Sequence, residues 1–485
     1  MSRAIVWFRR DLRVQDHPAL ANALRDHEEV IPVFVFDEPL LRSQVFGAGC
    51  VRFMLDCLAE LQRSLAGSGL AFQWRRGDPR EEIPKLARDM RADAVLWNRD
   101  YDPVAVERDH LVMRALAKQG VAVRTFKDHM VFDPDEIRTA DGGGFQRYSA
   151  YRAKWWAKWW TEAPVTATLP PMKPSASAPS RTIEPFPSAT ELGYQDLVPA
   201  TPGGERRALG RLRSFLAGPI HRYGTGRNRP AKDETSVLSP HFRFGTLSPR
   251  SAIRQALRTL SDRDSQGNGA SRSDVVTWID ELVWRDFFHQ VLAHYPHVAG
   301  EAFRATAVAP PRPDGPEARR LFQIWCEGRT GYPLVDAGMR QLNHTGWMHN
   351  RVRMVAASFL AKDLRLDWRW GERYFMNRLL DADLAVNNGN WQWCASTGTD
   401  AMPGYRIFNP ALQGKKFDPE GEYVRRYVPE LTPVPDRYIH EPWRMGVEEQ
   451  ERCGCRIGIQ YPAPLVDHEQ ARREYLALAE AARTA

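Results

Sequence analysis

Short apolar runs alternate with helical patterns of apolar residues over the first 130 or so positions of the chain. The runs are rich in Val, Phe and Trp and end in turn or charged residues, as buried strands do. They lie at residues 4–8, 30–36, 71–75, 94–97 and 121–126. Between them, residues 51–66 and 104–118 carry apolar side chains at helical spacing. This alternation predicts a doubly wound parallel sheet of Rossmann-like type.

The pattern changes after residue 130. Residues 131–205 combine a tryptophan-rich helical stretch with a segment dense in Pro, Ser, Ala and Thr, which is typical of a linker. The indoles recur at one-turn spacing, which favours packing between domains over a ligand site. From residue 206 to 485 strand signals almost vanish and helical patterns follow one another. We therefore predict an α/β domain at 1–130, an interdomain linker at 131–205 and an all-α domain at 206–485.

Composition narrows the classes of protein to which the chain can belong. There is no run of eighteen apolar residues and no secretory signal, so we expect a cytoplasmic protein that does not enter a membrane. Six cysteines without disulfide-like or zinc-like spacing predict neither a disulfide framework nor a metal site. A net charge of +7 permits a polyanionic partner, and sixteen tryptophans indicate a large aromatic ligand or a stacking surface.

Residues 381–393 form the most unusual stretch, with two carboxylates, three asparagines, a glycine and two tryptophans in thirteen positions. Asp, Asn and Gly favour turns and caps, so the stretch is poor material for an ordinary helix or strand. It predicts a shaped wall of a binding site. Taken alone, it could also be a polar loop with two anchoring indoles.

Three further stretches place polar side chains together. Residues 235–239 cluster hydroxyl groups beside a turn, which suits phosphate oxygens but also simple helix capping. One helical face would carry Glu281, Trp284 and Arg285, a carboxylate, a stacking plane and a cation, unless this is an ion-paired surface helix. Residues 350–354 put an amide, an arginine and a methionine on adjoining faces, where methionine can also fill a core.

Taken in order, these stretches resemble the photolyase and cryptochrome family over nearly the whole chain. Most similar are its enzymes for cyclobutane pyrimidine dimers of bacterial class I type. The matching motifs are Val6-Trp-Phe-Arg-Arg-Asp-Leu-Arg13, Thr235-Ser-Val-Leu-Ser239, Glu281-Leu-Val-Trp-Arg285, Thr330-Gly-Tyr-Pro-Leu-Val-Asp336, Trp347-Met-His-Asn-Arg351 and Asn387-Asn-Gly-Asn-Trp-Gln-Trp393. So many separate motifs in one order exclude chance, although each motif alone is weak.

The resemblance implies a folded-back FAD in the C-terminal helical domain. Its phosphates and ribitol would be bound by Tyr223, Thr235, Ser236, Val237, Leu238 and Ser239. The other cofactor contacts would be Arg285, Asn350, Arg353, Asp381, Asp383 and Asn387. In the family, Arg353 and Asp381 would pair beside the isoalloxazine, and Asn387 would face its N5. Charges and hydrogen bonds at these positions tune a flavin's chemistry.

The resemblance also implies a DNA lyase that repairs cyclobutane pyrimidine dimers with light. Excited reduced FAD would pass an electron to a dimer flipped out of the helix, and the electron would return after the ring splits. The substrate side would consist of Glu281, Trp284, Asn350, Met354 and Trp393. A cryptochrome-type blue-light receptor and a (6-4) photolyase are the alternatives, and this complete set of residues favours dimer repair.

Electron supply and DNA contacts follow from the same resemblance. Trp391 and Trp368 match the first two of the family's three electron-transferring tryptophans. The third position falls near Gly315, where no tryptophan stands, and we hypothesise that Trp370 or a nearby tyrosine provides another exit. Phosphate contacts to damaged DNA would come from Arg227, Arg351 and Arg406.

An antenna chromophore would bind the N-terminal domain. After the predicted fourth strand, the stretch that begins at Asn98 lacks the Asn-Glu pair of folate-using members. This favours a deazaflavin or a flavin over folate, with an empty antenna site as the alternative. The expected partner is DNA that contains pyrimidine dimers, and the expected oligomeric state is a monomer.

Overall fold

The computed structural model describes residues 2–170, 185–197, 199, 201–264, 272–304, 313–401 and 406–484. The chain divides into two compact units. The first consists of Met1–Arg222, Ser236–Pro296 and Leu380–Ala385, and the second of Tyr223–Thr235, His297–Leu379 and Val386–Ala485. The domain limits expected from the sequence stay a prediction, and part of the expected linker lies outside the described residues.

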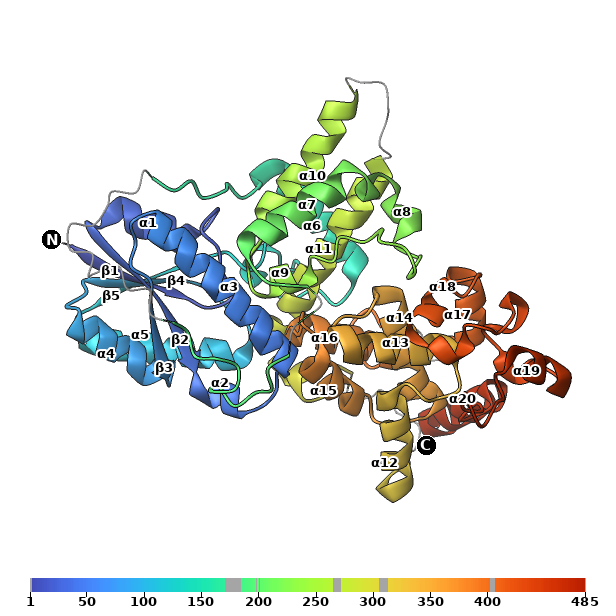
Figure 1. The fold of residues 1–485 in the computed structure, drawn as a ribbon. Coiled ribbons are helices and arrows are strands. Elements are labelled where there is room, and N and C mark those ends of the chain that lie inside the picture. Colours follow the sequence, from blue (N-terminus) through green and yellow to red (C-terminus); the bar gives the residue numbers. More distant parts are fainter. Residues whose placement is uncertain are drawn as a thin grey trace. The chain divides into compact units, whose positions relative to one another are not determined.

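The first unit contains a five-stranded parallel sheet with strand order β3-β2-β1-β4-β5 (Figure 1). The strands are β1 Arg3–Phe8, β2 Glu29–Asp37, β3 Gln73–Gly77, β4 Ala94–Asn98 and β5 Ala122–Phe126. The connecting helices are α1 Pro18–Asp26, α2 Glu38–Arg42, α3 Ala48–Gly67, α4 Pro79–Asp89 and α5 Pro103–Lys118. The chain leaves β1 toward β2 and later returns to its other side at β4. This arrangement confirms the predicted doubly wound sheet.

The central strands β1, β2 and β4 are mostly apolar and buried, because helices cover both faces of a doubly wound sheet, whereas the edge strands β3 and β5 carry arginines. Trp7 of β1 and Trp97 of β4 are both buried, and their rings meet edge to face at 5.5 Å. Ile5 and Val33 extend the same core. Full burial of such side chains stabilises a fold by about 1.5–3 kcal/mol each.

The first unit also contains five helices outside the sheet region, and the first of them, α6, is the stretch rich in tryptophan. They are α6 Tyr148–Glu162, α7 Glu205–Ala217, α9 Ser239–Arg243, α10 Pro249–Asp264 and α11 Arg272–His294. The indole of Trp155 on α6 donates to Asp286 on α11 at 3.1 Å, and that of Trp156 donates to Asp280 at 2.9 Å. These indoles therefore attach α6 to α11 within the first unit.

Gly245 occupies a position that only glycine fits. Its φ is +60°, and a Cβ there would collide with the carbonyl oxygen of Arg10 and lie 2.6 Å from the Cα of Asp11. Gly245→Ala is expected to lower the free energy of unfolding by about 1–3 kcal/mol, because it adds backbone strain and overpacking. Gly210→Ala within α7 is the matched control, since a Cβ at Gly210 meets nothing within 4 Å. It should raise stability by about 0.5–1 kcal/mol. Chemical denaturation measures both, and equal effects would contradict the expectation.

The second unit is helical among its described residues. Its longer helices are α12 Gly315–Glu327, α13 Pro333–Thr345, α14 Asn350–Ser358, α15 Trp368–Arg378, α16 Leu384–Ala395, α17 Pro410–Phe417 and α20 His468–Thr484. The shorter ones are α8 Tyr223–Gly226, α18 Glu422–Tyr427 and α19 Val447–Cys453. A π-helical turn, Phe359–Asp363, follows α14. The predicted helical second half is confirmed. No helix among the described residues is long and apolar enough to cross a membrane.

One of the sequence motifs has a structural role in this unit. The buried carboxylate of Asp336 accepts hydrogen bonds from the backbone and hydroxyl of Thr330 at 2.7 and 2.6 Å. The Tyr461 hydroxyl donates to the same carboxylate at 2.6 Å. Residues 330–336 thus tie the loop before α13 to a segment near the C-terminus.

The expectation that residues 381–393 avoid helical structure is wrong for most of the stretch, because α16 begins at Leu384. Side chains that usually break helices are bonded along it. Asn390 donates to the carbonyl oxygen of Val386 at 2.8 Å, and Gln392 donates to Asn388 at 2.9 Å. Gln392 also donates to the carbonyl oxygen of Val298 at 3.1 Å. Tertiary contacts therefore override the weak local propensity.

Candidate functional site

The loop at residues 235–239 has a strained backbone. Val237 has φ +49°, although β-branched residues rarely adopt the left-handed region. The carbonyl oxygen of the preceding residue, Ser236, accepts from Arg211 Nε at 2.9 Å, and Ser239 begins the short helix α9. Strain of this kind is retained mainly at functional loops. The loop therefore fits a ligand-binding role better than simple helix capping.

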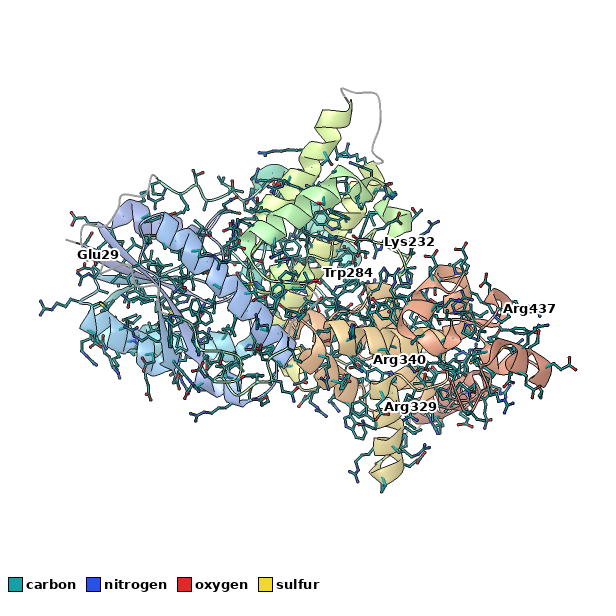
Figure 2. All side chains as sticks on the ribbon, viewed as in Figure 1. Glu29, Lys232, Trp284, Arg329, Arg340 and Arg437 are labelled. Atoms are coloured by element: carbon teal, nitrogen blue, oxygen red, sulfur yellow. The ribbon has the colours of Figure 1, made fainter. Side chains whose placement is uncertain are left out.

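Helix α11 carries Glu281, Trp284 and Arg285, as the sequence predicts. Trp284, which is labelled in Figure 2, is half-buried and stacks on the ring of Tyr148 at 3.5 Å with an interplanar angle of 7°. Arg285 is buried and donates to the carbonyl oxygen of His129 at 2.7 Å. One turn of α11 thus presents a fixed aromatic plane beside a fixed cation.

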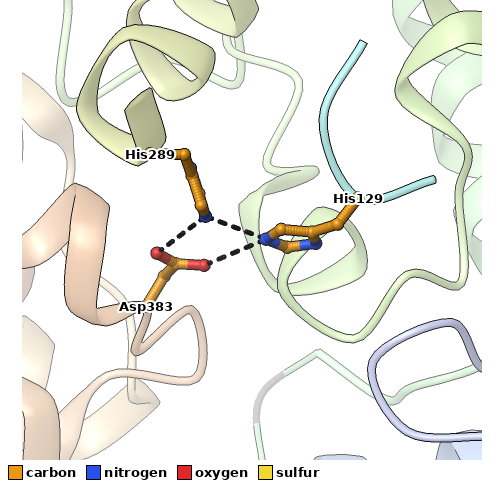
Figure 3. A group of neighbouring side chains, drawn as sticks. All are labelled: His129, His289 and Asp383. Atoms are coloured by element: carbon orange, nitrogen blue, oxygen red, sulfur yellow. Dashed lines mark hydrogen bonds and ion pairs between the residues drawn. The ribbon is translucent and has the colours of Figure 1, made fainter. Parts of the chain in front are cut away.

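Asp383 lies directly before α16 and is surrounded by side chains that the sequence analysis did not single out (Figure 3). Its oxygens lie 3.4 Å from His289 Nε2 and 3.7 Å from His129 Nε2, and it accepts a hydrogen bond from Arg10. Burial alone would raise the pKa of the Asp383 carboxyl, but His289 and Arg10 hold that pKa well below its usual range. Asp383 is therefore a buried carboxylate.

Sequence reasoning missed His129 and His289 because a lone histidine in an apolar stretch carries no pattern of its own. One signal was available for His289, which follows Arg285 by four residues and so shares its helical face. Arg10 lies in the N-terminal motif but had no assigned role. The structure brings Arg285 and Asp383 together through the ring of His129, which both of them approach.

Helix α14 in the second unit begins at Asn350 and carries Arg351, Arg353 and Met354. Arg351 Nη2 donates to Asn228 Oδ1 at 2.6 Å, and Arg353 Nε donates to the carbonyl oxygen of Met348 at 2.8 Å. These contacts fix the directions of both arginines. In the same unit, Tyr223 begins α8, and the guanidinium of Arg227 lies 5.4 Å from the centre of the Tyr223 ring.

Helix α16 positions Asn387, Trp391 and Trp393. The Asn387 amide donates to the carbonyl oxygen of Glu372 at 2.9 Å, which ties its side chain to α15. Trp391 is buried, with ring contacts to Phe375 at 5.0 Å and Trp325 at 6.1 Å. Trp393 is half-buried. Two positions apart on one helix, the indoles point in different directions.

The other predicted electron-transfer residues lie on α15. Trp368 begins this helix and is buried, while Trp370 is half-buried and its ring lies 5.4 Å from that of Phe322. Gly371, next to Trp370, allows close approach of the Trp391 ring, with which a Cβ would collide. Helices α15 and α16 therefore meet through aromatic side chains.

The buried carboxyl of Glu372, whose backbone bonds Asn387, makes the stability of the protein depend on pH. Burial raises the pKa of the Glu372 carboxyl to about 7. Between pH 4.5, the ordinary pKa of a glutamate carboxyl, and pH 7, the native state binds more protons than the unfolded state. The free energy of unfolding therefore falls as pH rises through this window. Glu372→Gln is expected to stabilise the protein by about 1–2 kcal/mol at pH 8 and very little at pH 4. Thermal unfolding at both pH values tests this, with exposed Glu317→Gln as the control. A pH-independent effect would contradict it.

The chain combines a Rossmann-like parallel sheet with a helical second half. Residues 4–171 match the DNA photolyase model, and residues 278–481 match the FAD binding domain of DNA photolyase. The chain belongs to the DNA photolyase and cryptochrome family. It is 39% identical over 490 residues, 99% of each chain, to the deoxyribodipyrimidine photo-lyase of Halobacterium salinarum.

Solved structures give the same relationship. A class III photolyase from Agrobacterium tumefaciens has 36% identity and a TM-score of 0.89, with 100% of this chain and 98% of that chain covered. A cryptochrome from Synechocystis has 29% identity and a TM-score of 0.86, with 99% of both chains covered. An archaeal photolyase from Sulfolobus tokodaii, solved with two FAD molecules, has 30% identity and a TM-score of 0.80, with 99% and 100% covered.

Proposed function

We propose that this protein repairs cyclobutane pyrimidine dimers in DNA with light and a bound FAD, as a deoxyribodipyrimidine photo-lyase. One observation carries the proposal. Residues 278–481 match the FAD binding domain of DNA photolyase, and this range includes the five residues that we assign to the substrate side. That set is Glu281, Trp284, Asn350, Met354 and Trp393. The relatives named as deoxyribodipyrimidine photo-lyases support the same activity.

The residues present fit FAD. The strained loop at Val237 suits a ligand that stabilises it, and the fixed Asn387 amide offers a carbonyl oxygen to an N–H group. The proposed cofactor contacts are Tyr223, Thr235, Ser236, Val237, Leu238, Ser239, Arg285, Asn350, Arg353, Asp381, Asp383 and Asn387. When bound and reduced, FAD supplies the electron that light excites for transfer to a dimer. Asp383 then contributes a fixed negative charge, and Asn387 a hydrogen-bonding group.

On the substrate side, Trp284 and Trp393 supply aromatic planes for a pyrimidine dimer flipped out of the base stack. The rigid stacking of Trp284 on Tyr148 means that this plane needs no reordering when a dimer arrives. Glu281 and Asn350 hydrogen-bond the polar edges of the dimer, and Met354 fills the remaining space. We assign the path by which electrons reach the flavin to Trp391 and Trp368, with Trp370 as the end of this path at the surface.

Damaged DNA is the partner, and phosphate contacts come from Arg227, Arg351 and Arg406. Such contacts give binding that depends on damage but not on sequence and weakens with salt. We assign a monomer in the cytoplasm, built from domains at 1–130 and 206–485. The class I subtype remains a prediction. A deazaflavin or flavin antenna remains part of the proposal, and the two FAD molecules of the Sulfolobus photolyase support a flavin.

Illumination of the pre-reduced protein with an oligonucleotide that carries one thymine dimer tests the proposal. Blue light should restore both thymines, darkness should restore none, and a (6-4) photoproduct should remain. Repair of only the (6-4) oligonucleotide would favour that photolyase instead. FAD binding with repair of neither lesion would favour the cryptochrome-type receptor.

A further inference from the structure

Three buried side chains converge on one point of the first unit (Figure 3). They come from distant parts of the chain, His129 after β5, His289 on α11 and Asp383 before α16. His129 Nε2 and His289 Nε2 lie 2.9 Å apart, and His289 Nε2 lies 3.4 Å from Asp383 Oδ1. Exposed fractions of 6%, 2% and 4% keep water away from all three. Protonation at this point must therefore follow from the neighbouring donors and acceptors.

The neighbours of His129 fix its ring as an acceptor. Arg10 Nη2 lies 3.0 Å from His129 Nε2, whereas Arg285 Nη2 lies between the two ring nitrogens, 2.8 Å from Nε2 and 2.9 Å from Nδ1. Guanidinium groups only donate hydrogen bonds, so His129 Nε2 must present its lone pair. Burial, Arg10 and Arg285 all hold the pKa of His129 well below its usual range. The His129 ring is therefore neutral.

The neighbours of His289 require the opposite. His289 Nε2 faces an oxygen of the Asp383 carboxylate at 3.4 Å, and because a carboxylate can only accept, this nitrogen carries a hydrogen. His289 Nδ1 lies 2.8 Å from the carbonyl oxygen of Arg285, which can only accept. Both ring nitrogens of His289 thus carry a hydrogen, and the ring is an imidazolium.

We propose that His289 is a buried imidazolium that fixes Asp383 as a carboxylate, which makes His289 a positioning residue of the FAD site. The role toward FAD rests on the proposed function. A buried positive charge persists when it is paired and hydrogen-bonded, and Asp383 and the Arg285 carbonyl oxygen supply both conditions. The charged or titratable groups that face the cluster are Arg10, Asp100, Asp102, Arg243, Arg285 and Asp286.

A bound metal ion would need the same atoms in a different state. Ligand atoms of His129, His289 and Asp383 all lie within 4.8 Å of one another, which is compatible with a divalent cation. Such a cation would require lone pairs on both Nε2 atoms. Arg10 already directs an N–H group at His129 Nε2, and His289 Nε2 carries a hydrogen toward Asp383, so neither lone pair is open to a cation. The geometry therefore favours a proton over a metal.

Nitrogen-15 NMR of the holoprotein with labelled histidine tests the protonation state. At pH 8 both ring nitrogens of His289 should resonate as those of an imidazolium. His289→Gln assigns the signal, and if that variant does not fold, the signal that responds to Asp383→Asn assigns it. Asp383→Asn should return His289 to a neutral ring at pH 8. A neutral His289 in the unaltered protein, or one equivalent of zinc by atomic absorption, would overturn the proposal.

The midpoint potential of bound FAD tests the positioning role. His289→Gln should move the potential to a more negative value, because a positive charge near the flavin is lost. His110→Gln should leave the potential unchanged. A protonated His289 whose removal leaves the potential unchanged would overturn the role toward FAD. Failure of dimer repair in a protein with a protonated His289 would instead reject only the proposed function.

Discussion

Asp128→Ala is expected to lower the free energy of unfolding by about 3–5 kcal/mol, because it leaves buried arginines without their main anion. Asp128 accepts from Arg13 at 2.5 and 3.0 Å and from Arg250 at 2.7 Å, and all three side chains are 2% exposed. Burial opposes ionisation, but Arg13 and Arg250 hold the pKa of Asp128 well below its usual range. Urea denaturation measures the loss.

A surface carboxylate that also pairs with two arginines provides the control for this substitution. Asp26 also pairs with two arginines, at 2.9 Å with Arg25 and 2.6 Å with Arg124, but 31% of its side chain is exposed to solvent. Solvent screening makes such pairs worth little, so Asp26→Ala should have a much smaller effect. Comparable losses for the two variants would show that burial does not set the strength of the Asp128 cluster. Asp16 lies 3.3 Å from Arg250 and stays in place in the Asp128→Ala variant. It compensates part of the lost charge and so reduces the loss of stability.

Trp391→Phe and Trp393→Ala are expected to damage different steps, although the residues are two positions apart. Trp391 is buried against Phe375 and Trp325, and a phenyl ring is harder to oxidise than an indole. Trp391→Phe should slow photoreduction by about tenfold or more, since each 1.4 kcal/mol of added barrier is tenfold in rate. Repair by enzyme reduced beforehand should be nearly unchanged. Flash absorption and single-turnover repair separate the two steps.

Trp393→Ala should instead weaken binding of dimer-containing DNA. Loss of one base-stacking surface costs about 1–3 kcal/mol, or roughly 5- to 150-fold in Kd. Photoreduction should continue at its usual rate. Trp370→Phe is the companion variant, and unchanged photoreduction in it would refute the proposed exit. Identical phenotypes for Trp391→Phe and Trp393→Ala would refute the division of labour between them.

The sheet could be predicted from the sequence because its signal is local. Short apolar runs such as Val30 to Phe36 owe their pattern to burial on both faces, which any strand in this setting shares. The predicted bounds differ from the observed ones by one or two residues, for example at β3, because the ends of a strand depend on its pairing with neighbouring strands. The helical second half could also be predicted, because the spacing of apolar residues within each helix is a local signal.

The parts that could not be predicted depend on neighbours distant in sequence. Helix α16 forms because Gln392 reaches Val298 and Asn387 reaches Glu372, and no local rule contains these contacts. The same holds for His129 and His289, which meet although 160 residues separate them. The side-chain roles came from the family resemblance, while the Asp383 surroundings came only from the fold.

Helix α16 also constrains how this segment of the chain can change in length. Each residue of an α-helix adds about 100° of rotation and about 1.5 Å of rise. One inserted or deleted residue between Asn387 and Trp391 would turn both indoles away from their present directions at once. Single substitutions can be absorbed one role at a time, but a change of length cannot. We therefore expect insertions and deletions in α16 to abolish several roles together.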